Sequence, residues 1–197
     1  MKRIFLTIAL AIITTFVFAT RPHIDNVRVN AKNSTIKWTG SKVASSHEGT
    51  VNIQKGILMI DHGTLVGGQF SIDMNSILCS DIESVKKSNY LVDHLKDKAF
   101  FNVEKFPLST ITIKEAVKSE ENSYKILADL TIKGITHPVT FQAEVTINGP
   151  NFSATAKIKI DRTKWGIVYK SGNFFKDLGD NIIKDEIEFD VFLLSVK

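Results

Sequence analysis

Apolar and polar residues alternate along most of the chain with a period of two. This period puts alternate side chains on one face of a β-strand, so that one face packs on a core while the other meets solvent. The interruptions at 61–63 and 148–151 have compositions typical of turns between strands. The pattern predicts about eight to ten strands. They fall at 35–39, 51–53, 56–60, 66–74, 108–114, 124–133, 139–147, 152–160 and 187–193.

One stretch between residues 79 and 106 has a different period. Its apolar residues recur at the spacing of an α-helix, and polar residues occupy the opposite positions. Ser80 or Asp81 can cap its first turn. The pattern therefore predicts one amphipathic helix within a β protein. The apolar stripe of this helix is made by Ile82, Val85, Val92 and Leu95.

The fold class follows from the number of strands with one apolar face. Such strands bury that face by packing as two sheets or by closing into a barrel, and a barrel also removes the sheet edges. A barrel of about eight strands is filled by its own side chains or holds one small ligand. Alanines at inward positions 128, 143, 154 and 156 favour an internal space. The alternative is that large residues such as Trp38 fill it.

A charged residue continues the apolar face of one predicted strand. From Phe152 the inward positions run to Ile160, and Arg162 is next in that register. An inward Arg is unfavourable unless it has a partner or an anion. Asp185 continues the inward register of the last strand, and the two residues meet at one barrel mouth if these strands are antiparallel neighbours. We therefore predict a partly buried, bidentate pair between Arg162 and Asp185, with an anion site at Arg162 as the alternative.

The segment 163–184 between those two strands is too long for a hairpin turn. Long segments inside compact domains are usually functional lids or disordered, and the aromatic residues of this segment argue against disorder. We predict that it folds over one mouth of the barrel, where Trp165 and Phe174 shape an apolar entrance. The alternative is a flap packed on the outer surface.

The first residues have the composition of a secretory signal peptide. Lys2 and Arg3 precede an apolar run over 4–18, which ends in a small-residue cleavage site at Ala19. The run is about 15 residues long, whereas a membrane-spanning helix needs about 20; a retained anchor is the alternative. We therefore predict a signal peptide at 1–19, a single domain at 20–197 and a periplasmic or secreted location.

The charge of the chain argues against nucleic-acid binding. The chain has 25 Lys and Arg residues against 21 Asp and Glu residues, and removal of residues 1–19 leaves 23 basic residues. A nearly neutral domain without a basic cluster has no electrostatic attraction for nucleic acid.

The sequence contains no catalytic or metal-binding motif. Its five His residues lack the spacings typical of metal sites, and no Gly-x-Ser-x-Gly motif occurs. The single cysteine, Cys79, excludes an internal disulfide, and no basic residue beside it in the sequence would lower its pKa. We therefore predict no metal, no cofactor and no catalytic residue.

Five short motifs are specific in their order and spacing. They are Lys37-Trp38 leading to 47–50, then 69–74, then 93–95 with Phe100-Phe101 and Phe106-Pro107, then 130–139, and finally 161–167. Together they resemble the YceI-like family of secreted, lipocalin-like proteins that bind polyisoprenoids. The resemblance implies an all-β fold with one short helix, an antiparallel lipocalin-like β-barrel of about eight strands that holds one long apolar chain.

The predicted function is non-enzymatic binding, with carriage or storage, of a polyisoprenoid or similar lipid. The alternatives are an enzyme acting on an isoprenoid or fatty-acyl substrate and a secreted interaction module with a filled barrel. The sequence leaves open whether the chain forms a homodimer. The residues expected to contact the ligand are Trp38, Phe70, Ile72, Ile126, Leu130, Phe141, Ile158, Trp165, Phe174, Phe189 and Val191, with Arg162 and Asp185 at a polar mouth.

Overall fold

Nine strands and one α-helix make up the part of the chain that the structure describes. The structure is a computed structural model and describes residues 23–196, so the signal peptide predicted at 1–19 lies outside the described residues. In chain order the elements are β1 (Ile24–Arg28), β2 (Thr35–Lys42), β3 (Ser46–Asp61), β4 (Thr64–Cys79), α1 (Val85–Lys96), β5 (Leu108–Lys118), β6 (Ser123–Ile132), β7 (Ile135–Asn148), β8 (Asn151–Asp161), the 3-10 helices η1 (Arg162–Trp165) and η2 (Gly179–Asn181), and β9 (Ile183–Leu194).

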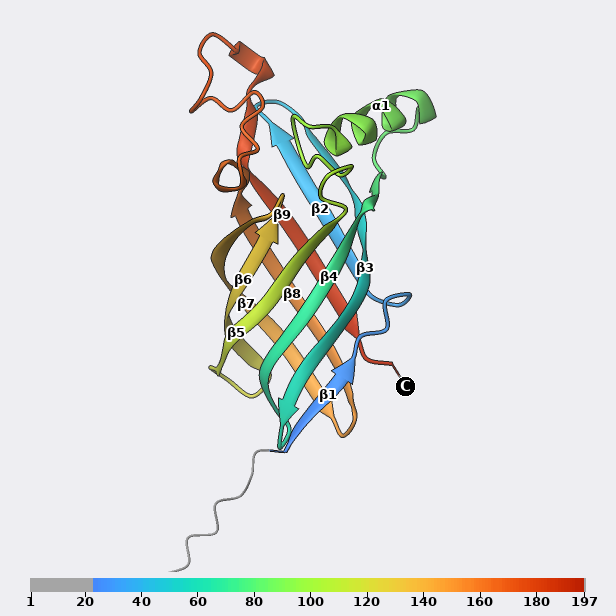
Figure 1. Ribbon diagram of the computed structural model, residues 1–197, viewed down its shortest axis with the longest axis vertical. Helices are drawn as coiled ribbons and strands as arrows, with labels where there is room; N and C mark the ends of the chain where they lie inside the picture. Colours follow the sequence, from blue (N-terminus) through green and yellow to red (C-terminus); the bar gives the residue numbers. More distant parts are fainter. Residues whose placement is uncertain (1–22, 197) are drawn as a thin grey trace, which may run out of the picture.

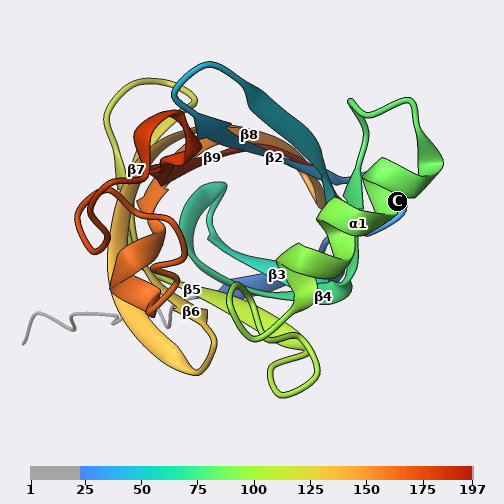
Figure 2. The ribbon, with the colours of Figure 1, turned by 90° about the horizontal axis from the view of Figure 1, so that it is seen from above.

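Eight of these strands close into a barrel (Figures 1 and 2). They pair in the order β3-β2-β9-β8-β7-β6-β5-β4, and β4 pairs again with β3. All these pairs are antiparallel. The remaining strand, β1, pairs with the half of β3 that β2 leaves free, so that β1 and β2 lie end to end along one partner. The predicted fold class, an antiparallel β-barrel of about eight strands with one short helix, is confirmed.

The β3–β4 hairpin contains a bulge that changes which residues face inward. In the sequence, Val66 lies at the same alternate positions as Phe70, Ile72 and Met74, which predicts that it faces inward, and the Gly67-Gly68 pair is typical of a bulge. In the structure Met59 pairs with Gly67 and Ile60 with Leu65, so Val66 is the extra residue of the bulge. An extra residue reverses the alternation. Leu65 is therefore buried and Val66 exposed, which corrects the predicted register at this end of β4.

The helix α1 begins later than the sequence predicts. Ser84 is at its N-cap, in place of Ser80 or Asp81. The Asp81 carboxylate accepts hydrogen bonds from the Glu48 backbone N–H (3.2 Å) and the Cys79 thiol (3.1 Å), so it is held at the rim of the barrel. The helix lies at one end of the barrel, beside β4 (Figure 1). No helix within residues 23–196 has the length and apolar character needed to span a bilayer.

Candidate functional site

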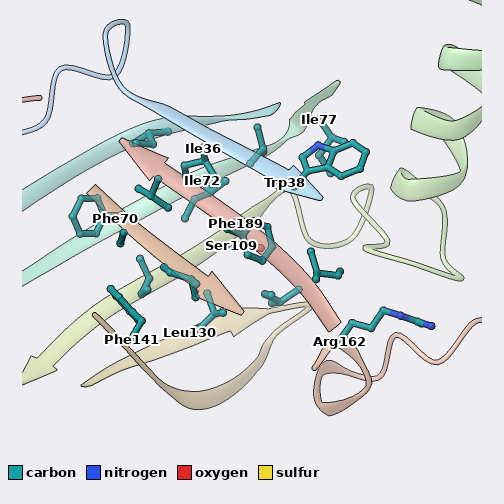
Figure 3. A pocket seen from close by; sticks show the side chains of 18 of the residues that line it. Ile36, Trp38, Phe70, Ile72, Ile77, Ser109, Leu130, Phe141, Arg162 and Phe189 are labelled. Atoms are coloured by element: carbon teal, nitrogen blue, oxygen red, sulfur yellow. The ribbon is translucent and has the colours of Figure 1, made fainter. Parts of the chain in front are cut away.

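The barrel encloses an apolar cavity of about 240 Å³. Each of the eight barrel strands contributes side chains to its lining, and α1 adds Leu91 and Leu95. Figure 3 shows lining side chains from several strands, with Trp38 and Ile77 on the side of α1 and Phe70 and Phe141 farther along the barrel. Ser109, which is also labelled in Figure 3, is a polar side chain that lies between these two ends. Away from the mouth the lining side chains are almost all hydrocarbon, which suits an apolar ligand.

The burial of inward residues shows where the space lies along the barrel. Phe141, Phe189 and Val191 point inward and line the cavity, yet each is only partly buried. Tyr124 of β6 and Phe152 of β8 also point inward, nearer the other end, and are 1% and 4% exposed. An inward side chain stays accessible only where no neighbour fills the space beside it. The cavity therefore occupies the middle of the barrel and the end beside α1.

Large side chains fill the barrel at the end away from α1. Tyr124 and Phe152 are the second residues of β6 and β8, and Ile60 is the residue before the last of β3. All three are buried and none belongs to the cavity lining. At the opposite end the lining continues to Lys42 and His47, beside the opening. The cavity is thus blocked at one end and has its mouth beside α1.

Most of the residues expected to contact a ligand do line this cavity. Nine of the eleven predicted apolar residues do so: Trp38, Phe70, Ile72, Ile126, Leu130, Phe141, Ile158, Phe189 and Val191. They come from β2, β4, β6, β7, β8 and β9, and each follows the period of its strand.

The structure corrects the expected positions of Trp165 and Phe174. The chain leaves the β conformation at Arg162 and forms η1, so Trp165 turns away from the cavity. It is 1% exposed in a separate hydrophobic cluster, where its Nε1–H donates to the Leu130 carbonyl at 3.2 Å. Phe174 is 59% exposed. No residue of 163–182 lines the cavity, and Figure 2 shows this segment beside the opening and not across it.

Arg162 is held by groups of the chain itself. Its Nε donates to the Lys184 carbonyl (3.0 Å), Nη1 to the Ile167 carbonyl (2.6 Å), and Nη2 to the Ile183 carbonyl (2.9 Å). Nη2 also lies 3.3 Å from Asp185 Oδ1. Burial lowers the pKa of Arg162, against the opposing charge of Asp185. In Figure 3 the guanidinium points away from the other lining side chains.

The pair between Arg162 and Asp185 has one contact and not two. The other carboxylate oxygen, Oδ2, accepts hydrogen bonds from Ser171 Oγ (3.0 Å) and Asn173 Nδ2 (2.7 Å). Asp185 therefore joins Arg162 to the start of the 166–182 segment. The donors of Arg162 are thus occupied by the chain itself, and the residue stabilises the rim of the barrel. The predicted pair with Asp185 is present, but its predicted bidentate geometry is wrong.

Trp38 has a fixed position at the rim because of the glycine opposite. Trp38 pairs with Gly49 of β3. A Cβ at Gly49 would lie 1.8 Å from the Leu78 carbonyl oxygen and 2.6 Å from the Trp38 ring. The Trp38 Nε1–H donates to that same carbonyl at 3.1 Å. Because Gly49 has no side chain, the Trp38 indole fits beside it at the mouth and keeps its hydrogen bond to the Leu78 carbonyl.

A small polar cluster joins β3 to the chain after β4 at the rim. His47 Nδ1 lies 2.9 Å from Asp81 Oδ2, and Cys79 donates to Asp81 Oδ1. Burial would raise the pKa of Asp81, but hydrogen bonds from Cys79, His47 and the Glu48 N–H together lower it. Within residues 23–196, no three His, Cys, Asp or Glu side chains are grouped so as to hold a metal ion.

Alkylation of Cys79 is expected to be slower at neutral pH than that of a free thiol. Burial raises the pKa of Cys79 above its ordinary value of 9.0, and the Asp81 carboxylate adds to this shift. Since the thiolate is the reacting form, the rate should rise only at higher pH. The folded pKa exceeds the unfolded one, so the contribution of this group to stability is lost as pH rises through the folded pKa. Iodoacetamide rates measured against pH test this, and a midpoint at the ordinary value would contradict it.

Several residues that line the cavity near the mouth were not predicted from the sequence as ligand contacts. Leu91 and Leu95 come from α1, and Phe100 and Phe101 from the turn after it. The available signal was the apolar stripe of the helix followed by two phenylalanines. It does not indicate which strand ends the helix covers, because that depends on barrel closure.

Comparisons with known proteins agree with this architecture. A family model described as YceI-like domain matches residues 28–193. A UPF0312 protein of Photorhabdus laumondii is 37% identical over 94 residues, and one of Yersinia enterocolitica is 35% identical over 94 residues. Each match covers 44% of this chain and 44% of the relative, so the chain spans about half the length of these curated relatives.

Two solved structures share the fold. BcnA of Burkholderia cenocepacia has a TM-score of 0.67 at 21% identity, over 85% of this chain and 99% of that one. A polyisoprenoid binding domain from Saccharophagus degradans, implicated in plant cell wall breakdown, has a TM-score of 0.63 at 14% identity, over 89% of this chain and 98% of that one. Both likenesses concern the fold.

Proposed function

The chain belongs to the YceI-like domain family, and from that premise we propose that it binds a long-chain apolar ligand, a polyisoprenoid or similar lipid, and carries or stores it. The observation that carries this proposal is the apolar cavity lined by all eight barrel strands. Burial of apolar surface is worth about 25 cal/mol per Å², so a long hydrocarbon chain binds tightly here without a specific polar contact.

The distribution of titratable groups supports binding over catalysis. The titratable side chains in the cavity lining are Lys42, His47, Arg162 and Lys184, all at the mouth. A general acid or base must come within hydrogen-bonding reach of the reacting group. The buried part of a ligand meets hydrocarbon, and Arg162 is engaged by three carbonyls. The proposal is therefore carriage or storage without chemical change.

We also propose a periplasmic or secreted location, in which the protein moves an insoluble lipid through an aqueous compartment. The charged start and apolar run of residues 1–19 support it. N-terminal sequencing of protein recovered from the extracytoplasmic fraction tests it, and a chain that still begins at Met1 would contradict it.

Mass spectrometry of the purified protein tests the binding function. Protein prepared without added lipid should carry a co-purifying hydrocarbon ligand, visible by native mass spectrometry and recovered by organic extraction. If the protein is empty, it should take up prenyl or fatty-acyl probes. An empty protein that takes up neither class of probe would remove the proposal.

A further inference from the structure

Exposed apolar side chains surround the mouth of the cavity on three separate segments. Val43 lies in the β2–β3 loop, Val85 and Tyr90 lie on α1, and Phe174 and Phe175 lie in the 166–182 segment. Their exposed fractions run from 47% to 77%. Figure 2 shows the three segments around the opening of the barrel. We call these five residues the mouth ring.

The rest of the described surface has fewer exposed aromatic residues. Three of the five mouth-ring residues are aromatic, whereas the large aromatic side chain exposed on the barrel wall is Phe192 of β9, at 38%. Single exposed apolar residues are ordinary on protein surfaces, but a gathering around one opening indicates an interaction site.

Lysines accompany each part of the mouth ring. Lys42 precedes Val43, Lys86 and Lys87 follow Val85, and Lys176 follows Phe175. Over residues 42–45, 83–96 and 166–182 there are six Lys residues and four acidic residues, so the net charge is 6 minus 4, or +2. Exposed Phe and Tyr next to Lys is the composition of surfaces that enter the interfacial region of a bilayer, where the lysines reach anionic headgroups.

The arrangement suits a lipid surface better than a protein partner. A stable protein interface covers roughly 800 Å² per partner in one packed patch. The mouth ring consists of small apolar groups on three segments and not of one packed patch, although α1 and the 166–182 segment touch through His94 and Tyr169, whose ring centroids are 4.7 Å apart. A bilayer admits separate protrusions, because the lipids rearrange around each of them.

We propose that the mouth ring docks the barrel on an anionic lipid membrane with the cavity mouth facing the bilayer. A hydrocarbon chain then passes between bilayer and cavity without crossing water. The transfer of a hydrocarbon chain rests on the proposed function, whereas docking on the membrane does not require a ligand in the cavity.

Vesicle flotation tests the docking directly. The barrel closes within residues 23–196, so the chain from residue 20 is used, because the apolar run 4–18 would itself bind vesicles. The vesicles are phosphatidylcholine with and without about one third phosphatidylglycerol. The unchanged protein should float with the anionic vesicles and less with the neutral ones. The double variant Phe174→Ser with Phe175→Ser should bind about tenfold more weakly or worse.

Phe192→Ser is the matched control, since it removes an exposed Phe from the barrel wall. It should leave vesicle binding unchanged. Both variants should retain a prenyl probe in native mass spectrometry, which separates failure of docking from failure of the proposed function. Absence of binding to both vesicle types, or equal binding by the double variant, would overturn docking. A third result would also overturn docking on a membrane: the unchanged protein does not bind vesicles but cross-links to another protein, and the double variant loses that cross-link. The mouth ring would then be a site for a protein partner.

Discussion

Replacing Arg162 by Met is expected to lower the free energy of unfolding by about 3–5 kcal/mol. The substitution keeps much of the apolar stem but leaves the carbonyls of Lys184, Ile167 and Ile183 without their donor. It also leaves Asp185 without its cation. Buried polar groups that lose their partners bear their full desolvation cost. Urea denaturation followed by tryptophan fluorescence measures the change.

Lys159→Met on the same strand is the control. Lys159 lies on the outer face, where it pairs with Glu186 and Glu188 at about 3 Å with 57% of its side chain exposed. Exposed pairs of this kind contribute little to stability, so no clear change is expected. Asp185→Asn should fall between the two. Its amide oxygen can still accept from Ser171 and Asn173, but the charge is lost and an NH2 donor replaces the oxygen that accepts from Arg162. If Arg162→Met matched Lys159→Met, Arg162 would not be the structural centre of the rim.

Replacing Ala156 by Phe should reduce retention of a long-chain ligand at least tenfold while the barrel remains folded. Ala156 lines the cavity from β8 and faces Val191 and Ala143 in the neighbouring strands. A phenyl ring at this position occupies the space that the hydrocarbon needs. Each methylene that the ligand can no longer bury costs about 0.8 kcal/mol, so the loss of two already gives about tenfold. Competition with a fluorescent prenyl or fatty-acyl probe measures the affinity.

The matched control is Lys157→Phe, one residue along the same strand. Lys157 points outward, with 86% of its side chain exposed. The same ring added outside the barrel should leave ligand affinity unchanged. A melting temperature for Ala156→Phe close to that of the unchanged protein would show that the ring enters open space and not a packed core. Equal affinities for the two variants would contradict binding inside the barrel.

The part of the barrel that the sequence predicts well is the part with uninterrupted pairing. Strands β6 to β9 pair without a register shift, so within these four strands the period of two assigns the inward residues correctly. In the β3–β4 hairpin the register shifts three times. A bulge is a property of two strands together, and periodicity within one strand does not locate it.

The rim was harder to predict because its contacts join distant parts of the chain. The inward register indicated Arg162 and Asp185, and they do meet. The three carbonyls that bind Arg162 belong to loop and strand-end backbone and carry no sequence signal. Trp165 and Phe174 were expected at the entrance from their aromatic character. Their positions depend instead on η1 and on the hydrogen bonds of Asp185.

The side chains that fill the far end give the cavity a limited depth, which sets the length of hydrocarbon that the proposed ligand can bury. From Phe152 to Asp161 the chain advances nine residues along β8, which at about 3.3 Å each and a tilt of about 40° gives a depth of roughly 23 Å. Affinity should therefore rise with each prenyl unit until the hydrocarbon reaches the rim and then level off. On the proposed function, a shorter lipid should lie entirely inside the barrel, whereas a longer one should leave its end outside, accessible to an acceptor.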